Sequence, residues 1–381
     1  MHGAGHFHYH ASRLSKTGVL LWAHTLKILA SGLVGVFIPL YLYNLKYSFQ
    51  SILVLFFLVG LFWVLLLYPT MKFMNRYGAT RGLALGNFAH VIIIGLLITL
   101  PDFHWPLWLI GLASGVQISF YWPSFRILFT RSLAHKKTGR NVGMMSAVTS
   151  IGSGLAPAVG GVVATVFGIT YIYYIAIALF IVSAVVVLAG EETVRAESFS
   201  FNFKQLRRYW HDLTSGFSNQ FEGAVGEVVW PFFIFFLVPS YAGVGLLSSV
   251  TVVASILIAL YVGRREEARG ERHYLKEGIA INTFSNSLRI LTQNAVHVTG
   301  VNLITGLASP LYLTAFNTRY YKKTEEYGLV YLFPMQFAAA VSWMALFAVL
   351  YGVSFLLPDK ETLLVGILLA IPASLGIMRI R

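Results

Sequence analysis

The sequence predicts an all-α, polytopic membrane protein with twelve transmembrane helices in two six-helix pseudo-repeats. The first observation is composition: of the 381 residues, 57% are hydrophobic and only 11% are charged, and the mean hydropathy is +0.70. Soluble domains carry about 25% charged residues, so this composition excludes a water-soluble globule. The second observation is that the apolar residues form long runs, and the third is how the basic residues are distributed between those runs.

Each predicted span is an apolar run close to or above the length of about 20 residues that a helix needs to cross a bilayer. We interpret the first run as a retained span, because it is too long for the apolar core of a signal peptide and no small-residue cleavage pattern follows it. The twelve runs cover residues 18–43, 50–68, 82–100, 105–125, 143–168, 170–190, 216–238, 242–262, 279–298, 300–318, 330–357 and 361–378.

The basic residues are distributed very unequally between the two sides of these spans. With the N-terminus on one side, 24 of the 28 Lys and Arg residues fall on that side, two fall on the other, and two lie inside spans. Because basic residues concentrate in cytoplasmic loops, we expect both termini in the cytoplasm. We expect an integral protein of a prokaryotic inner or cell membrane. The net charge of +13 reflects this topology, so nucleic acid is not an expected partner.

Short sequence echoes relate the two halves of the chain. Glycine pairs recur at an offset of 191 or 192 residues, and a Gly-Leu-Ala-Ser segment recurs at an offset of 195. Because these echoes agree on nearly one offset, we predict parallel six-helix halves with a substrate site between them near the bilayer midplane. The related positions are Gly32 and Gly35 with Gly223 and Gly226, Gly78 and Gly86 with Gly270 and Gly278, and 111–114 with 306–309.

These patterns divide the chain into four parts. They are a cytoplasmic, histidine-containing tail (1–17), an N-terminal six-helix half (18–190), a cytoplasmic linker (191–215) and a C-terminal six-helix half (216–381). In the linker, apolar residues fall at helical spacing with basic residues between them. This pattern indicates either a basic amphipathic helix on the inner leaflet or a solvated linker helix.

A small-residue motif lies in the fifth span. Its members give the helix a nearly bare face that another helix can approach closely, and its proline removes one backbone donor. The residues are Gly152, Ala156, Pro157, Gly160 and Gly161. The motif resembles the fifth-helix signature of major facilitator superfamily transporters, which is commonest among antiporters and exporters; the family has Gly where this chain has Ala156. A packing face of the kind found in many membrane helices is the alternative.

The loop after the second span carries Asn75, Arg76 and Gly78. It resembles the loop between helices two and three of the same family, with Asn75 where the family has an acidic residue. Asparagine carries no charge, so Asn75 does not supply the charge pair that this loop makes with neighbouring helices in the family. The resemblance implies that spans 1, 4, 7 and 10 line a central cavity.

Polar side chains inside the spans are the candidate pathway for substrate and protons. Ionisable groups there are unfavourable, so each one suggests a function. The candidates are Lys27 in span 1, Gln117 and Tyr121 in span 4, Glu222 and Glu227 in span 7, and Arg289 in span 9. Burial disfavours the charged form of a carboxylate, which prepares Glu222 or Glu227 to carry a proton. The alternatives are a static Lys27–glutamate pair and a structural role for Arg289.

Enzymatic and metal-binding motifs are almost entirely missing from the sequence. There is no P-loop, no nucleophile elbow, no dinucleotide-binding glycine motif and no cysteine, so we expect neither an enzyme nor a bound cofactor. His6, His8 and His10 are a weak candidate for a metal site, because no carboxylate or cysteine completes it. A tail with incidental histidines is the alternative.

Together these observations predict a secondary active transporter that moves a small organic solute by alternating access, most simply a monomer. Proton antiport that drives export is the leading hypothesis, with the solute, protons and the lipid bilayer as the partners. The alternatives are a metabolite or sugar importer or facilitator of the same fold, and a transport-inactive membrane receptor or scaffold.

Overall fold

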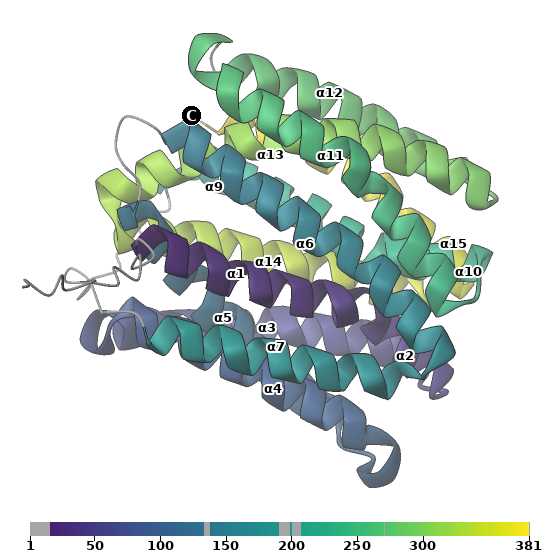
Figure 1. Cartoon of the computed structure of the whole chain (residues 1–381). Helices are drawn as coiled ribbons and strands as arrows, with labels where there is room; N and C mark the ends of the chain where they lie inside the picture. Colours follow the sequence, from purple (N-terminus) through teal and green to yellow (C-terminus); the bar gives the residue numbers. More distant parts are fainter. Residues whose placement is uncertain (1–15, 133–137, 190–198, 200–206, 270, 381) are drawn as a thin grey trace, which may run out of the picture.

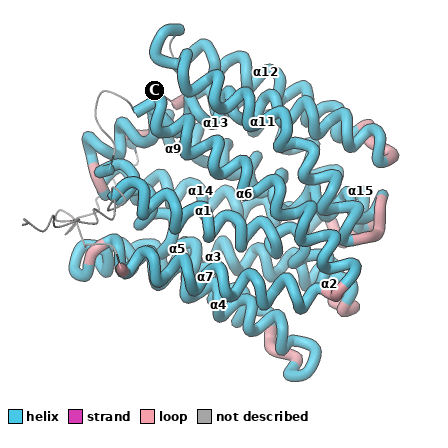
Figure 2. Tube along the Cα trace, viewed as in Figure 1, coloured by secondary structure: helices cyan, strands magenta, loops and turns pink. Residues whose placement is uncertain are grey.

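The computed structural model describes residues 16–132, 138–189, 199, 207–269 and 271–380, and their regular elements are helices that run roughly side by side (Figure 1, Figure 2). The first of them, α1 (Lys16–Val34), begins at the end of the bundle where the described chain also finishes, in η3 (Ile377–Arg379). We call this the terminal end and the other the opposite end.

The described helices form twelve transmembrane spans, which confirms the predicted fold class. Spans 1 and 7 are each interrupted by a short irregular turn. Spans 1 to 6 are α1 with η1 (Gly35–Phe37) and α2 (Ile38–Asn44), α3 (Phe49–Tyr77), α4 (Ala79–Phe103), α5 (Leu107–Ser132), α6 (Thr138–Val166) and α7 (Ile169–Leu188). Spans 7 to 12 are α9 (Trp210–Ala224) with η2 (Val225–Val229) and α10 (Trp230–Leu237), α11 (Tyr241–Arg269), α12 (Glu271–Ile290), α13 (Ala295–Tyr327), α14 (Leu329–Val353) and α15 (Asp359–Gly376) with η3.

Hydropathy alone identifies only some of these spans. Among the described residues, eight spans are long and apolar enough to cross a membrane, and shorter apolar stretches lie in α6 and α11. Helix α12 falls short because it carries polar side chains that are buried inside the bundle, such as Asn282, Asn286 and Arg289.

The boundary between spans 9 and 10 differs from the prediction, which ran span 9 to residue 298. Helix α12 ends at Ile290, and Asn294 begins α13 by accepting a hydrogen bond from the backbone N–H of His297 at 3.0 Å. A capping side chain of this kind satisfies a free donor of the first helical turn. Hydropathy does not reveal such a cap. Because α12 ends at Ile290, Arg289 lies in the last turn of its helix.

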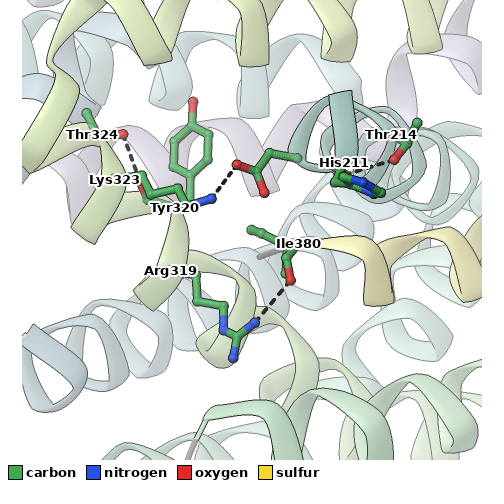
Figure 3. A network of polar contacts seen from close by, with 8 residues as sticks. His211, Thr214, Arg319, Tyr320, Lys323, Thr324 and Ile380 are labelled. Carbon is green, nitrogen blue, oxygen red and sulfur yellow. Dashed lines mark hydrogen bonds and ion pairs between the residues drawn. The ribbon is translucent and has the colours of Figure 1, made fainter. Parts of the chain in front are cut away.

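Span 7 also begins earlier than predicted, at Trp210 instead of residue 216. The first turn of α9 is tied into the bundle because Asp212 pairs with Lys323 of α13 (Figure 3) and Leu213 is buried. Nearby, Arg319 donates to the carbonyl of Ile380 at 3.0 Å, which holds the end of the chain against α13. Residues 191–198 and 200–206 of the predicted linker lie outside the described residues.

The two halves repeat the same helix packing. In the first half a Cβ on Gly86 of α4 would meet the backbone of Tyr121 on α5. In the second half a Cβ on Gly278 of α12 would meet the backbone of Tyr312 on α13. These glycines are related by the sequence repeat, so the pseudo-repeat is a repeat of backbone contacts.

The halves meet along two helix pairs, α6 with α11 and α3 with α14 (Figure 1). Each pair brings backbones together at small residues: a Cβ on Gly161 would meet the carbonyl of Tyr241, and one on Gly60 would meet the backbone of Met344. Trp343 also donates from Nε1 to the carbonyl of Phe56 at 2.9 Å. Small residues at helix contacts are typical of membrane proteins.

Candidate functional site

Spans 1 and 7 are both broken at the same level of the repeat. The irregular turn η1 interrupts span 1 at Gly35, and the π-helical turn η2 interrupts span 7 around Gly226, its repeat partner. A Cβ on either glycine would meet no atom within 4 Å, so open space lies beside both turns. Single π-helical turns are frequent at functional sites, and broken helices often form the binding sites of transporters.

A buried cation lies in the first half, on α1. The Nζ atom of Lys27 is 4.7 Å from the ring centroid of Tyr121 and 4.8 Å from that of Trp122, and the side chain is only 5% exposed. His24 fixes Tyr121 through a hydrogen bond of 2.8 Å between Nδ1 and the tyrosine hydroxyl, and stacks on Phe125. Aromatic faces stabilise a desolvated ammonium group, so Lys27 can remain here without a contacting carboxylate.

Glu227 belongs to η2 in the second half, and its side chain is exposed. Lys27 and Glu227 are close enough for their charges to interact. Within the described part of the chain they do not form a direct ion pair. Each half therefore contributes one charge of opposite sign, and the two side chains are not in direct contact.

Glu222 lies in a different environment, inside the second half. Asn286 donates to its Oε2 at 2.9 Å, and the same asparagine accepts from Arg289 at 3.0 Å. Arg289 also donates to Thr305 and lies 4.9 Å from the ring centroid of Trp230. Glu222 is 5% exposed and Arg289 is 3% exposed, so this linked pair belongs to the packing between α9, α12 and α13.

We expect Arg289→Met to lower the free energy of unfolding by about 3 kcal/mol, because it leaves Glu222 buried without its cation. Denaturation of the purified protein in detergent measures this loss. Adding Glu222→Gln to that variant should restore part of the stability, since the uncompensated charge is then gone. If the double variant loses the full sum of the two single losses, the two side chains do not act as a pair.

A cavity of about 140 Å³ lies within the first half, beside η1. Spans 1 to 4 supply most of its wall, and Trp343 of α14 closes it from the other half. Its polar lining includes Ser31, His90 and Gln117. The structure thus places the predicted Gln117 in a cavity one helical turn from Lys27 and Tyr121, and places Glu222 elsewhere.

At the terminal end of the bundle, spans of the two halves are in contact. The guanidinium of Arg126 lies 4.5 Å from the ring centroid of Tyr320, and Phe129 packs against Tyr321 with ring centroids 5.0 Å apart. The predicted fourth span, 105–125, ended just before Arg126. Helix α5 continues past it to Ser132, so it is a span residue that sequence reasoning missed.

A second set of contacts closes the opposite end. Tyr43 donates to Asp359 at 3.3 Å, and Asn44 donates to the hydroxyl of Tyr241 at 2.9 Å. Tyr43 also packs edge-on against Phe232 of α10. Contacts between spans of different halves are therefore present at both ends of the bundle.

A family model described as Major Facilitator Superfamily matches residues 20–380. The chain belongs to the major facilitator superfamily. A comparison with curated proteins found no match. Family membership makes the chain an integral membrane protein of a transporter family, which agrees with its apolar helices.

The span-5 motif of this superfamily member joins three helices. Gly152 and Gly160 face α1, where a Cβ would meet Ile28 and the carbonyl of Leu33 respectively. On the side facing α11, Gly161 packs against Tyr241, and the carbonyl of Pro157 lies against Gly245. Ala156 is buried within the same segment. The motif therefore connects the broken span 1 to the contact between the halves.

The loop motif contains a tight turn between α3 and α4. Gly78 has a φ of +93°, a backbone conformation that residues with a Cβ rarely adopt, and it caps α3 through a hydrogen bond to Met74. Arg76 is exposed and lies over the ring of Tyr77, while Asn75 precedes it on the last turn of α3. Among the described residues, no acidic side chain forms an ion pair with Arg76.

The weak metal-site prediction concerns three histidines of the tail. His6, His8 and His10 lie outside the described residues, and the described residues contain no group of three or more potential metal-binding side chains.

Proposed function

We propose that this chain is a proton-coupled secondary transporter that exports a small organic solute by alternating access. The observation that carries the proposal is the placement of Lys27 on α1 and Glu227 on the π-helical turn η2, one on each half, with charges close enough to interact. A carboxylate that is largely desolvated but still reached by water can exchange a proton. A nearby cation opposes that protonation.

The coupling step follows from this charge pair. While Glu227 is ionised, its attraction to Lys27 favours an arrangement in which spans 1 and 7 stay close. When Glu227 binds a proton this attraction is lost, and Lys27 becomes available to a solute. Protonation and solute binding therefore both change the free energy of the contact between the halves, which is the requirement for coupling.

The two sets of closing contacts supply the gates. Aromatic pairs and single hydrogen bonds contribute only about 0.5 to 1.5 kcal/mol each, so one set can break while the other persists. Rocking of one half against the other, along α3–α14 and α6–α11, would open the terminal end and the opposite end in turn. The irregular turns η1 and η2 lie where such a motion bends spans 1 and 7.

Because protonation of Glu227 favours solute binding in this scheme, solute and proton move in the same direction. Outward movement is supported by the span-5 motif, which resembles that of exporters. The test is solute flux in reconstituted vesicles, using the compound that most stabilises the purified protein in a thermal-shift screen of metabolites and drugs. We expect an imposed pH gradient to drive accumulation of that compound. Equal flux with and without the gradient would instead support a facilitator. The sign of the accompanying pH change distinguishes exchange of solute for protons from cotransport of solute with protons.

We further propose that the terminal end faces the cytoplasm, because most basic residues lie on that side. The chain has no cysteine, so single cysteines can report orientation. In intact cells, an impermeant thiol reagent should label Leu356→Cys at the opposite end and not Tyr77→Cys at the terminal end. Both positions are exposed. The reverse labelling pattern would invert the orientation.

A further inference from the structure

The cavity beside η1 contains hydrogen-bonding groups that the protein itself does not satisfy. Gln117 is 5% exposed, lines the cavity, and its Nε2 finds no hydrogen-bond partner among the described residues. Within the same described set, Ser31 Oγ and His90 Nδ1 also lack partners, and both residues line the cavity. Buried polar groups are nearly always hydrogen-bonded, so three such atoms around one cavity indicate a site for a polar ligand.

The chemistry of these groups favours an acceptor. The amide nitrogen of Gln117 only donates, the hydroxyl of Ser31 can donate, and His90 can donate from Nδ1 in one tautomer. A ligand with several acceptor oxygens satisfies all three at once. Hydrogen bonds to a charged acceptor are roughly twice as strong as neutral ones, which favours an anionic oxygen over a neutral carbonyl.

The local charge also favours an anion. Lys27 lies one helical turn from Ser31 along α1, and its charge reaches His90. The residues described as lining the cavity include no Asp or Glu. Glu227 is the carboxylate that opposes Lys27, and its protonation would leave the positive charge of Lys27 uncompensated next to the cavity.

Size and wall composition limit the rest of the ligand. A cavity of about 140 Å³ is similar to the cavities of about 150 Å³ that hold benzene, so the ligand has roughly six non-hydrogen atoms. Most of the wall is apolar and includes Ile93, Ile94 and Phe56, and Trp343 contributes from the other half. The ligand therefore has a short hydrocarbon part.

We propose that this cavity binds a small monocarboxylic acid as its anion, with the carboxylate on Gln117 and Ser31 and the short carbon chain against the isoleucines. The proposal rests on the proposed function in one respect, that the bound acid is the solute carried. Because loss of a proton from Glu227 weakens the pull of Lys27 on the anion, the site links acid binding to proton binding.

The first test compares acids with uncharged molecules of the same shape. Butyrate and isobutyrate are titrated into the purified protein beside butyramide and isobutyramide, with binding followed by calorimetry and by thermal shift. We expect saturable binding of the acids that is at least about tenfold tighter than that of the amides, as for a charged acceptor. Equal affinity of acids and amides, or no binding of either, would overturn the proposal.

The second test uses variants. Gln117→Leu should weaken butyrate binding by about tenfold or more, and Gln117→Glu, which is nearly isosteric, should abolish it by repulsion. Gln336→Leu removes a buried glutamine of α14 that does not line the cavity and should bind butyrate as the unchanged protein does. Equal weakening in all three variants would show a general loss of structure and contradict a site at Gln117.

A third variant tests the electrostatic argument even if the Gln117 variants do not fold. Glu227→Gln should bind butyrate more tightly at neutral pH than the unchanged protein does, because one negative charge is removed near the site. Weaker or unchanged butyrate binding would contradict the electrostatic argument. Flux in vesicles separates the two proposals: bound butyrate without transport refutes only the proposed function, whereas transport of another solute without butyrate binding refutes only this inference.

Discussion

Glu227→Gln should abolish accumulation driven by a pH gradient while leaving solute binding and solute exchange in place. A pH difference of one unit is worth about 1.4 kcal/mol per proton, so coupling to one proton supports a solute gradient of about tenfold. Glutamine has nearly the shape of a neutral glutamic acid but cannot release a proton. The accumulation ratio in vesicles containing the variant should therefore fall to about one, with counterflow exchange retained.

The matched control is Glu222→Gln. Its side chain keeps an acceptor for Asn286, with which Glu222 forms its hydrogen bond inside the second half. We expect this variant to be less stable than the unchanged protein but to accumulate solute in response to the pH gradient. If instead the Glu222 variant loses coupling and the Glu227 variant retains it, the proton site has been assigned to the wrong carboxylate.

The second large effect is expected for Gly161→Leu. A Cβ at Gly161 would already meet the carbonyl of Tyr241 and lie 3.2 Å from the Cα of Ala242, and both are backbone atoms of the other half. Added side-chain volume at a close-packed contact is destabilising by about 1 to 3 kcal/mol. Because this contact must persist while the halves rock, we expect transport to fall at least about tenfold.

Gly95→Leu is the control for this prediction. Gly95 also lies within a helix, but a Cβ there would meet no atom within 4 Å. We therefore expect normal membrane insertion of both variants and a loss of transport only at Gly161. The measurement compares the solute flux per inserted protein molecule between the two variants. Similar activity of the two variants would show that the α6–α11 contact is not part of the mechanism.

The sequence was sufficient to predict the fold because its two strongest signals are physical constraints of the bilayer. Apolar run length predicted twelve spans, and the glycine echoes predicted two halves, which the structure shows as matching contacts at Gly86 and Gly278. Helix ends were less predictable. The cap at Asn294 and the continuation of α5 through Arg126 depend on local hydrogen bonds and on contacts with the other half.

The sequence shows which ionisable residues lie inside the spans, but not which side chains they contact. Ionisable residues within spans pointed to Lys27, Glu222, Glu227 and Arg289, because such residues are unfavourable in a membrane. Their partners were not predictable, since Glu222 reaches Arg289 only through Asn286, a residue on another helix. The π-helical turn η2 also changes the direction of Glu227 relative to Glu222, which a regular helical spacing does not capture.

The most direct test of the account is the pH change that accompanies solute movement when no pH gradient is imposed. Vesicles containing the unchanged protein and an internal pH indicator are given a gradient of the stabilising solute. We predict a pH change that grows with the solute gradient and is absent in vesicles containing Glu227→Gln. Solute flux in the unchanged protein without any pH change would contradict proton coupling through Glu227.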